Sequence, residues 1–307
     1  MSWMTGRTLH TGQHRSTASP RRRSSSAVLR ALPWVALSLV GVMLSVGVPT
    51  GRGAEPTGES AGPSTPLPGA MTPTPSPSTR PAPVPEWTPL IDQDFDEPAA
   101  LGEFADVYPG WASYDGWHDT EGPGLYDSSR VVTVSDGILN EHLHTEDGEA
   151  LVVSITPVPH VQTYGRYEVR FRADEMPSYK IAWLLWPADD DWSKGEIDFP
   201  EAGLGAGDVI EGFSHYTGRR EGSSGFQITT DQDVHSWHTA VIEWRPDSLT
   251  WILDGVSYRT TDIGAIPNVP MYWSMQTEAD DPAPWTSGNV QIDYVRAWAY
   301  TGPGAVG

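Results

Sequence analysis

The sequence predicts an all-β fold, a sandwich of two antiparallel sheets, from about Trp87 onward. Three observations support this prediction. Short segments rich in strand-forming residues follow one another, Asp-Gly pairs and other turn signals separate them, and no segment shows a sustained helical period. Many short strands over about 220 residues are typical of a single large β domain.

Residues 1–54 have the composition of an export segment. Residues 1–30 are polar and basic, and Ala31–Val48 is a run of eighteen mostly apolar residues without charge. A run of this length suits either a secretory signal peptide, with a poor small-residue cleavage site at 51–54, or an uncleaved N-terminal signal-anchor in the membrane. Both alternatives place the rest of the chain outside the cell, either secreted or tethered to the cell surface.

Residues 55–86 are dominated by Pro, Thr, Ser and Gly, as in the run Thr72–Pro77. Such a composition cannot bury a core, so we expect an extended, disordered linker. The predicted organisation is therefore an export segment at 1–54, a linker at 55–86 and a β domain at 87–307.

The strands of the β domain are predicted from turn pairs and alternation. Asp-Gly pairs occur at 136–137, 147–148 and 254–255, each between strand-like runs, which is the pattern of β-hairpins. Tyr164–Ala173 alternates cleanly, with aromatic and aliphatic side chains on one face and charged ones on the other.

Three carboxylates lie within six residues, at Glu196, Asp198 and Glu201. In a strand, successive side chains alternate faces, so Glu196 and Asp198 share a face while Glu201 falls on the other. Pro200 cannot donate to a central ladder and is tolerated mainly at edges and bulges. A bulge at residues 199–200 adds one residue and returns Glu201 to the face of the other two acids.

The spacing of the two glutamates suits a retaining glycosidase. Their Cα atoms are expected roughly 13 Å apart, and side chains that lean together bring the carboxyl groups within about 5–6 Å. Asp198 lies between them, and three clustered carboxylates cannot all ionise, so at least one pKa should be raised. The alternatives for three nearby acids are a solvated acidic strand or a calcium site, but neither requires a bulge-forming proline.

The ordering Glu-Ile-Asp-x-x-Glu resembles the active-site strand of glycoside hydrolase family 16, in the bulged form shared by laminarinases and agarases. The resemblance covers roughly residues 89–300. It implies a concanavalin A-like β-jelly roll with a cleft across its concave sheet, and it implies that Glu196 is the nucleophile, Asp198 its helper and Glu201 the acid/base. Further segments that resemble strands of this family are Tyr164–Arg170, Ala182–Leu185, Trp244–Gly255 and Gln291–Arg296.

Two segments depart from the family pattern. Tyr179–Trp183 reads Tyr-Lys-Ile-Ala-Trp where the family usually has Trp-Pro-Ala-x-Trp, and Met275–Ala279 reads Met-Gln-Thr-Glu-Ala where the family often has an Asn and a Gly-Gly. Both lie where the family contacts sugar, so they bear on the substrate more than on the reaction.

Several side chains are predicted to contact the substrate. Trp192 lies four residues before Glu196, where the family has a tryptophan that stacks on sugar, an interaction worth about 1 kcal/mol beyond the buried area. His215 matches a His-Tyr pair of the family. For Trp183 a position in the cleft and a position in the core are equally consistent with the sequence, because a mid-strand tryptophan is often buried. The remaining candidates are Trp117, Gln276 and Trp285.

The predicted reaction needs no cofactor. Asp189–Gly195 resembles a calcium loop, but Lys194 occupies the sixth position, which requires glycine. Some members of the family bind a structural calcium through an aspartate of the closing strand and the carbonyl of a turn glycine. Asp293 and Gly137 match those positions, so the resemblance implies a structural calcium there.

Charge excludes several classes of partner. Up to Glu86 the chain carries eight arginines and three acidic residues, which leaves 11 basic and 37 acidic residues, a net charge of −26, for the β domain. Such a domain repels nucleic acid, anionic membranes and sulfated polymers, so a neutral polysaccharide is the expected partner. Cysteine is absent, so no disulfide supports the fold. We expect a monomer.

The leading prediction is a retaining endo-β-glycosidase that hydrolyses a neutral polysaccharide such as β-1,3- or mixed-linkage glucan. Two alternatives stay open, a non-catalytic carbohydrate-binding jelly roll and a transglycosylase that remodels cell-surface glycan. The complete set of three acids argues against a lectin. A transglycosylase uses the same covalent intermediate, so sequence does not separate it from a hydrolase.

Overall fold

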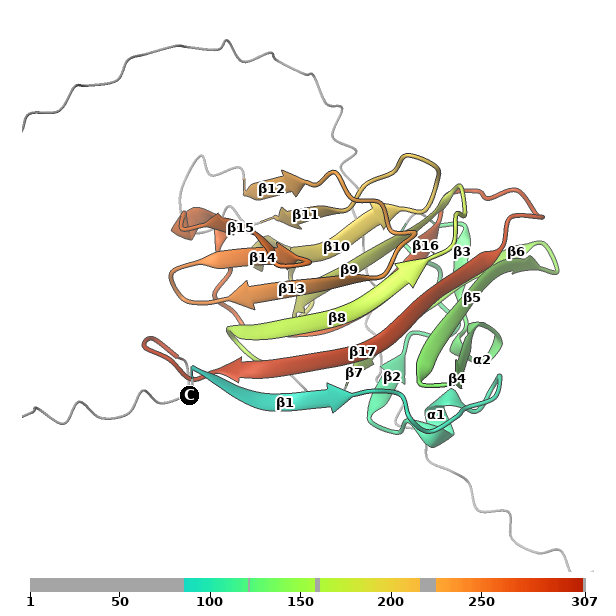
Figure 1. Cartoon of the computed structure of the whole chain (residues 1–307), viewed down its shortest axis with the longest axis horizontal. Helices are drawn as coiled ribbons and strands as arrows, with labels where there is room; N and C mark the ends of the chain where they lie inside the picture. Colours follow the sequence, from blue (N-terminus) through green and yellow to red (C-terminus); the bar gives the residue numbers. More distant parts are fainter. Residues whose placement is uncertain (1–85, 121, 158–160, 216–224, 306–307) are drawn as a thin grey trace, which may run out of the picture. The chain divides into compact units, whose positions relative to one another are not determined.

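The computed structural model describes residues 86–305 except 121, 158–160 and 216–224 (Figure 1). The predictions of an export segment and of nearly all of the linker lie outside these residues. Across the described part of the chain, no helix is long and apolar enough to cross a membrane.

Two sheets account for most of the described residues, and all their strand pairs are antiparallel except one. The strands of the larger sheet are β1 (Trp87–Gln93), β3 (Gly124–Tyr126), β4 (Val132–Ser135), β5 (Ile138–Glu146), β6 (Glu149–Val152), β8 (Gly165–Ala173), β13 (His238–Trp244), β14 (Leu249–Leu253), β15 (Val256–Thr260) and β17 (Gly288–Tyr300). Their order is β15-β14-β13-β8-β17-β5-β6-β3, while β1 pairs with β17 and β4 with β5. The pair β3–β6 is parallel.

The smaller sheet carries the predicted site. Its strands are β2 (Trp111–Ser113), β7 (Ser154–Pro157), β9 (Tyr179–Pro187), β10 (Ile197–Gly203), β11 (Glu211–Ser214), β12 (Phe226–Thr229) and β16 (Met271–Ala279). Their order is β12-β11-β10-β9-β16-β7-β2, so β10 lies inside the sheet between β9 and β11. The described helices are single turns, namely α1 (Phe104–Val107), α2 (Ser128–Val131) and the 3₁₀ turns η1 (Trp192–Lys194) and η2 (Ile263–Ala265). The predicted all-β sandwich is confirmed, and the described residues form no long helix.

The Asp-Gly pairs form the expected hairpin turns. Between β14 and β15, Asp254 and Gly255 have φ values of +49° and +85°. Two successive left-handed residues are the signature of the type I′ turn, whose twist matches that of the flanking strands, and glycine and aspartate tolerate this region best. The hairpins β4–β5 and β5–β6 turn in the same way.

The core lies between the two sheets and is rich in aromatic rings. Trp183 of β9 packs on Phe171 of β8 with ring centroids 5.0 Å apart. Phe199 of β10 approaches Trp251 of β14 at 6.3 Å. All four side chains are buried, so the inner face of β10 is fixed against the larger sheet. This leaves the opposite face of β10 for the carboxylates.

Glu141 of β5 is an acid within this core. It is fully buried, on the same face as Leu139 and Leu143, and neither of its carboxyl oxygens has a hydrogen-bond partner. Burial raises the pKa of Glu141 to about 8, because ionisation would place an uncompensated charge in the core. The folded protein therefore holds this carboxyl protonated at neutral pH.

We expect Glu141→Leu to stabilise the protein in a pH-dependent way. The folded state binds this proton more tightly than the unfolded state, because burial raises the pKa from 4.5 to about 8. The free energy of unfolding of the wild type is therefore highest below pH 4.5, and between pH 4.5 and about pH 8 it falls by about 1.4 kcal/mol per pH unit. Leucine cannot ionise and escapes this loss. Thermal unfolding should show the largest gain in Tm near pH 8 and the smallest near pH 4.5. A gain independent of pH would contradict the assignment.

Candidate active site

The bulge predicted at residues 199–200 is present in β10. Against β9, Asp198 pairs with Leu184 and Glu201 pairs with Ala182, so β10 advances three residues where β9 advances two. The same shift occurs against β11. The extra residue puts Asp198 and Glu201 on one face, while Phe199 faces the core. The peptide bond between Phe199 and Pro200 is cis.

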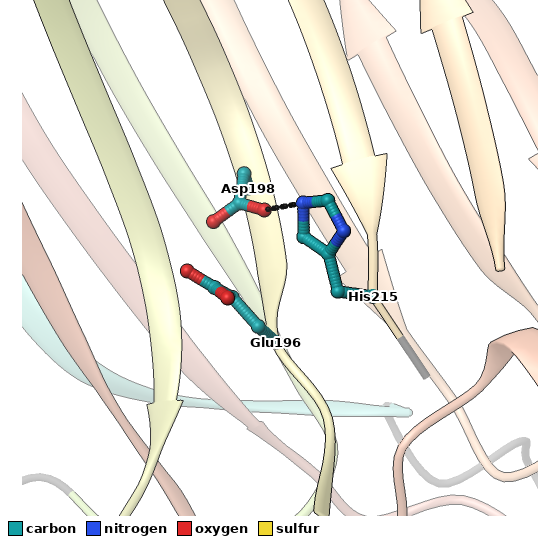
Figure 2. Close-up of side chains that lie close together, drawn as sticks. All are labelled: Glu196, Asp198 and His215. Carbon is teal, nitrogen blue, oxygen red and sulfur yellow. Dashed lines mark ion pairs between the residues drawn. The ribbon is translucent and has the colours of Figure 1, made fainter. Parts of the chain in front are cut away.

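Glu196, Asp198 and His215 form a compact group at one end of β10 (Figure 2). Figure 2 shows the two carboxyl groups facing each other, with the imidazole approaching Asp198 from the end of β11. Nε2 of His215 lies 3.2 Å from Oδ2 of Asp198. The backbone N–H of His215 donates to the carbonyl oxygen of Glu196 at 3.0 Å. His215 thus ties the end of β11 to the site, where the sequence placed it.

The pKa values of this group are shifted by burial. Burial raises the pKa of Glu196 well above its ordinary value, and the charge of Asp198 raises it further. Burial likewise raises the pKa of Asp198, followed by the charge of Glu201. Glu196 and Asp198 also hydrogen-bond each other, a contact that needs a proton on one of the two carboxyl groups.

Trp192 contacts Glu196 directly. Its indole Nε1–H donates to Oε2 of Glu196 at 2.7 Å, which favours the ionised form of that carboxyl. The side chain belongs to η1 and remains 48% exposed, so part of it is accessible to a ligand. The structure therefore places Trp192 beside the carboxyl of Glu196.

Glu201 has a different environment. Burial raises its pKa to about 7, Lys180 opposes this rise, and Glu278 adds to it. Lys180 of β9 and Glu278 of β16 form an ion pair, with Nζ 2.7 Å from Oε2. Neither residue was expected at the site, although both lie in the two segments that depart from the family pattern. A carboxyl with a pKa near 7 can both give and take a proton at neutral pH.

The structure connects three other predicted residues to the acids to different degrees. Gln276 shares the face of Glu201, because Ala182 pairs with both residues. Trp117 is half-exposed in the segment that leads to Tyr126, whose hydroxyl reaches Gln276 at 3.4 Å. Trp285 is 84% exposed in the connection between β16 and β17, and the described contacts do not link it to the acids.

The prediction that Trp183 contacts substrate is wrong. The side chain is 0% exposed and packs in the core. Glu201 pairs with Ala182, so the residues of β9 that face the acids are the even-numbered ones and Trp183 points the other way. The tryptophan on the acid side of β9 is Trp186, which pairs with Tyr272. Sequence reasoning missed Trp186, because the face that it takes depends on the register between β9 and β10, which no local pattern fixes.

The implied calcium site does not fit the residues present. Asp293 lies at a bulge of β17, and its carboxylate is paired with the guanidinium of Arg170. That guanidinium already supplies the positive charge that a calcium ion would bring, and the carbonyl of Gly137 alone is a weak ligand. In the described chain, the His and acidic side chains close enough to share a cation are Glu196, Asp198 and His215. The carboxyl of Glu196 is held instead by the indole N–H of Trp192.

Comparison with known sequences identifies a family. Residues 142–296, which include all three acids, match a family model described as glycosyl hydrolases family 16. This match spans half of the chain. A search of curated protein sequences finds no significant match.

Solved structures share the fold. The laminarinase from Rhodothermus marinus aligns with a TM-score of 0.58 at 20% identity, over 70% of this chain and 98% of its own. LamA from Zobellia galactanivorans, solved with laminaritriose and laminaritetraose, aligns with a TM-score of 0.53 at 20% identity, over 69% and 98%. A structure from work on endo-acting O-glycanases of human gut microbiota aligns with a TM-score of 0.57 at 17% identity, over 68% of this chain and 98% of its own. At these identities the likeness shows the fold alone.

The two tryptophans with opposite placements give a direct test. We expect Trp183→Ala to lower the free energy of unfolding by about 3–5 kcal/mol, because it opens a cavity between the sheets. Trp192→Ala is the matched control, and its half-exposed side chain should cost less than about 1 kcal/mol. Urea unfolding measures both. Equal losses of stability would contradict the core position of Trp183.

Proposed function

This chain belongs to family 16 of the glycosyl hydrolases, and from that premise we propose that it is a retaining endo-β-glycosidase. Its proposed substrate is a neutral polysaccharide, with β-1,3-glucan or mixed-linkage glucan as the backbone. The observation that carries the proposal is the bulge of β10, which gives Glu196, Asp198 and Glu201 one common face. Two glutamates on one strand, one of them with a pKa near 7, supply a nucleophile and an acid.

In this proposal Glu196 is the nucleophile. Asp198 is 2% exposed, whereas Glu196 accepts a hydrogen bond from the indole of Trp192. The proton of the pair therefore rests on Asp198 when the Glu196 carboxylate attacks the anomeric carbon. The new bond is a glycosyl ester, and the bond from the anomeric carbon to the leaving oxygen breaks in the same step.

Glu201 serves as acid and then as base. It gives its proton to the leaving oxygen, which departs as a hydroxyl group of the shortened chain. The resulting Glu201 carboxylate takes a proton from a water molecule, whose oxygen attacks the anomeric carbon and releases Glu196. Two inversions restore the original configuration. A pKa of about 7 keeps a substantial fraction of Glu201 protonated at neutral pH, as the first step requires, and the second step uses the carboxylate that the first leaves.

The choice of a neutral substrate rests on charge and aromatic surface. The net charge of −26 beyond Glu86 disfavours polyanions. Trp192, half-exposed beside Glu196, and Trp186, on the acid face of β9, offer rings on which pyranose faces stack. The structures that share this fold include laminarinases and one from a study of mucin O-glycanases, so the fold does not select the sugar. Export and a monomeric state stay predictions.

A panel of polysaccharides tests the substrate class. We expect turnover of β-1,3-glucan or mixed-linkage β-glucan, with oligosaccharides of intermediate length as first products, because an endo-acting cleft accepts internal bonds. Sulfated galactan is the charged control and should be turned over more slowly than any neutral glucan or galactan. Faster turnover of carrageenan would overturn the neutral assignment. Products longer than the substrate would indicate transglycosylation.

Azide distinguishes the roles of the two glutamates. With an activated aryl glycoside, Glu201→Ala should still form the covalent intermediate, since a good leaving group needs no proton. Azide should then give the β-glycosyl azide, whereas Glu196→Ala lacks the nucleophile and should give the α-azide by a single inversion. NMR of the products assigns the configuration. Azides of the same configuration from both variants would show that the roles are misassigned.

A further inference from the structure

The two segments that depart from the family pattern meet on the acid face of the smaller sheet. Lys180 of β9 and Glu278 of β16 are direct Cα partners, with Nζ and Oε2 2.7 Å apart. On its other side Lys180 pairs with Gly203 of β10, two residues beyond Glu201. Side chains two residues apart on a strand share a face, so Glu201 and Lys180 are diagonal neighbours. Such neighbours have Cα atoms about 7–8 Å apart, within reach of a lysine.

Glu278 is fixed and almost removed from water. Its side chain is 1% exposed, while that of Lys180 is 29% exposed. Oε1 of Glu278 accepts hydrogen bonds from the hydroxyl of Thr120 and, at 3.1 Å, from Nε2 of Gln276. The segment that carries Thr120 is anchored next to β16, because Asp119 accepts the backbone N–H of Ala279 at 2.7 Å. The negative end of the ion pair therefore has a defined position.

A buried ion pair adds little stability of its own. Removing two charges from water costs several kcal/mol, and an apolar pair of similar size is often as stable. The same low dielectric lets each charge act strongly on a nearby titrating group. Lys180 lies between Glu201 and Glu278 in the strand order β10-β9-β16, and its charge acts more strongly on Glu201 than that of Glu278.

Other charged groups also face Glu201. Along β10 they are Glu196 and Asp198, on β11 Glu211 is its Cα partner, and His215 stands at the end of the same strand. Glu211 accepts a hydrogen bond from the hydroxyl of Thr229 on β12. Apart from His215, these groups are acidic. Among the described lysines and arginines, Lys180 is therefore the one whose charge favours the ionised form of Glu201.

We propose that Lys180 and Glu278 are positioning residues for Glu201, with the ammonium favouring its carboxylate form and the buried carboxylate favouring its protonated form. Together the two charges set the pH at which Glu201 exchanges its proton. The inference rests on the proposed function only in giving Glu201 the role of acid/base, since its electrostatic part holds without any substrate.

Single substitutions should move the titration of Glu201 in opposite directions. Glu278→Gln is isosteric and removes the negative charge, so Glu201 should titrate at lower pH, by about one unit. Lys180→Met removes the positive charge and should move the titration to higher pH by a similar amount. Lys180→Arg keeps the charge and should stay near the wild type. The chain has only one other lysine, Lys194, which pairs with Asp189, so Lys194→Met is the matched control and should cause no shift.

Two measurements on the full chain report the titration. The alkaline limb of kcat/KM against pH on a soluble glucan follows the protonated fraction of Glu201. The ¹³C chemical shift of its carboxyl carbon in protein labelled with [¹³C]glutamate follows the same proton without substrate, and Glu201→Gln assigns the signal. If Lys180→Met does not fold, the double variant Lys180→Met/Glu278→Gln carries no unpaired charge, and it should titrate above Glu278→Gln.

The outcomes separate this inference from the proposed function. Opposite shifts in both measurements support it. Opposite shifts of the carbon signal in a protein inactive on every glycan also support it, while the proposed function fails. An active enzyme in which Glu278→Gln and the double variant titrate like the wild type would overturn the inference alone. Shifts of the same sign for the two single variants, as a general loosening of the site would produce, would also overturn it.

Discussion

Strand β10 gains one residue between Asp198 and Glu201 relative to both of its neighbours, and the arrangement of the site depends on that gain. Without it, Glu201 would point toward the larger sheet, where Phe199 packs near Trp251. A carboxyl there would meet an apolar core that cannot pair it. The bulge therefore satisfies two demands together, an apolar inner face and three acids on the outer one.

Three acids on one face repel one another when they are ionised. Different groups surround them at the two ends of β10. At the Glu196 end, the indole of Trp192 and the imidazole of His215 approach the carboxyl groups. At the Glu201 end, a full charge pair of Lys180 and Glu278 takes their place. Different environments allow two identical carboxyl groups to differ in proton affinity, which the proposed pair of nucleophile and acid requires.

Strands β9 and β16 carry the two segments that depart from the family pattern. β9 and β16 supply Lys180, Trp186 and Glu278 to the acid face, while their other faces pack in the core. In the proposed function, β10 holds the reacting groups while β9 and β16 hold groups around them, so one fold can keep the reaction and change the sugar. The shared fold of laminarinases and of a structure from a study of mucin O-glycanases accords with this division.

The sequence by itself determined the features that local rules control. Alternation gave the strand faces, Asp-Gly pairs gave the hairpins, and Pro200 at the parity-breaking position gave the bulge and the common face of the three acids. Tertiary structure alone decided what depends on register between distant strands. The pairing of Ala182 with Glu201 sends Trp183 to the core and Trp186 to the acid side, and the pairing of β9 with β16 joins Lys180 to Glu278. A one-residue slip in either register would reverse those faces, and no local pattern fixes it.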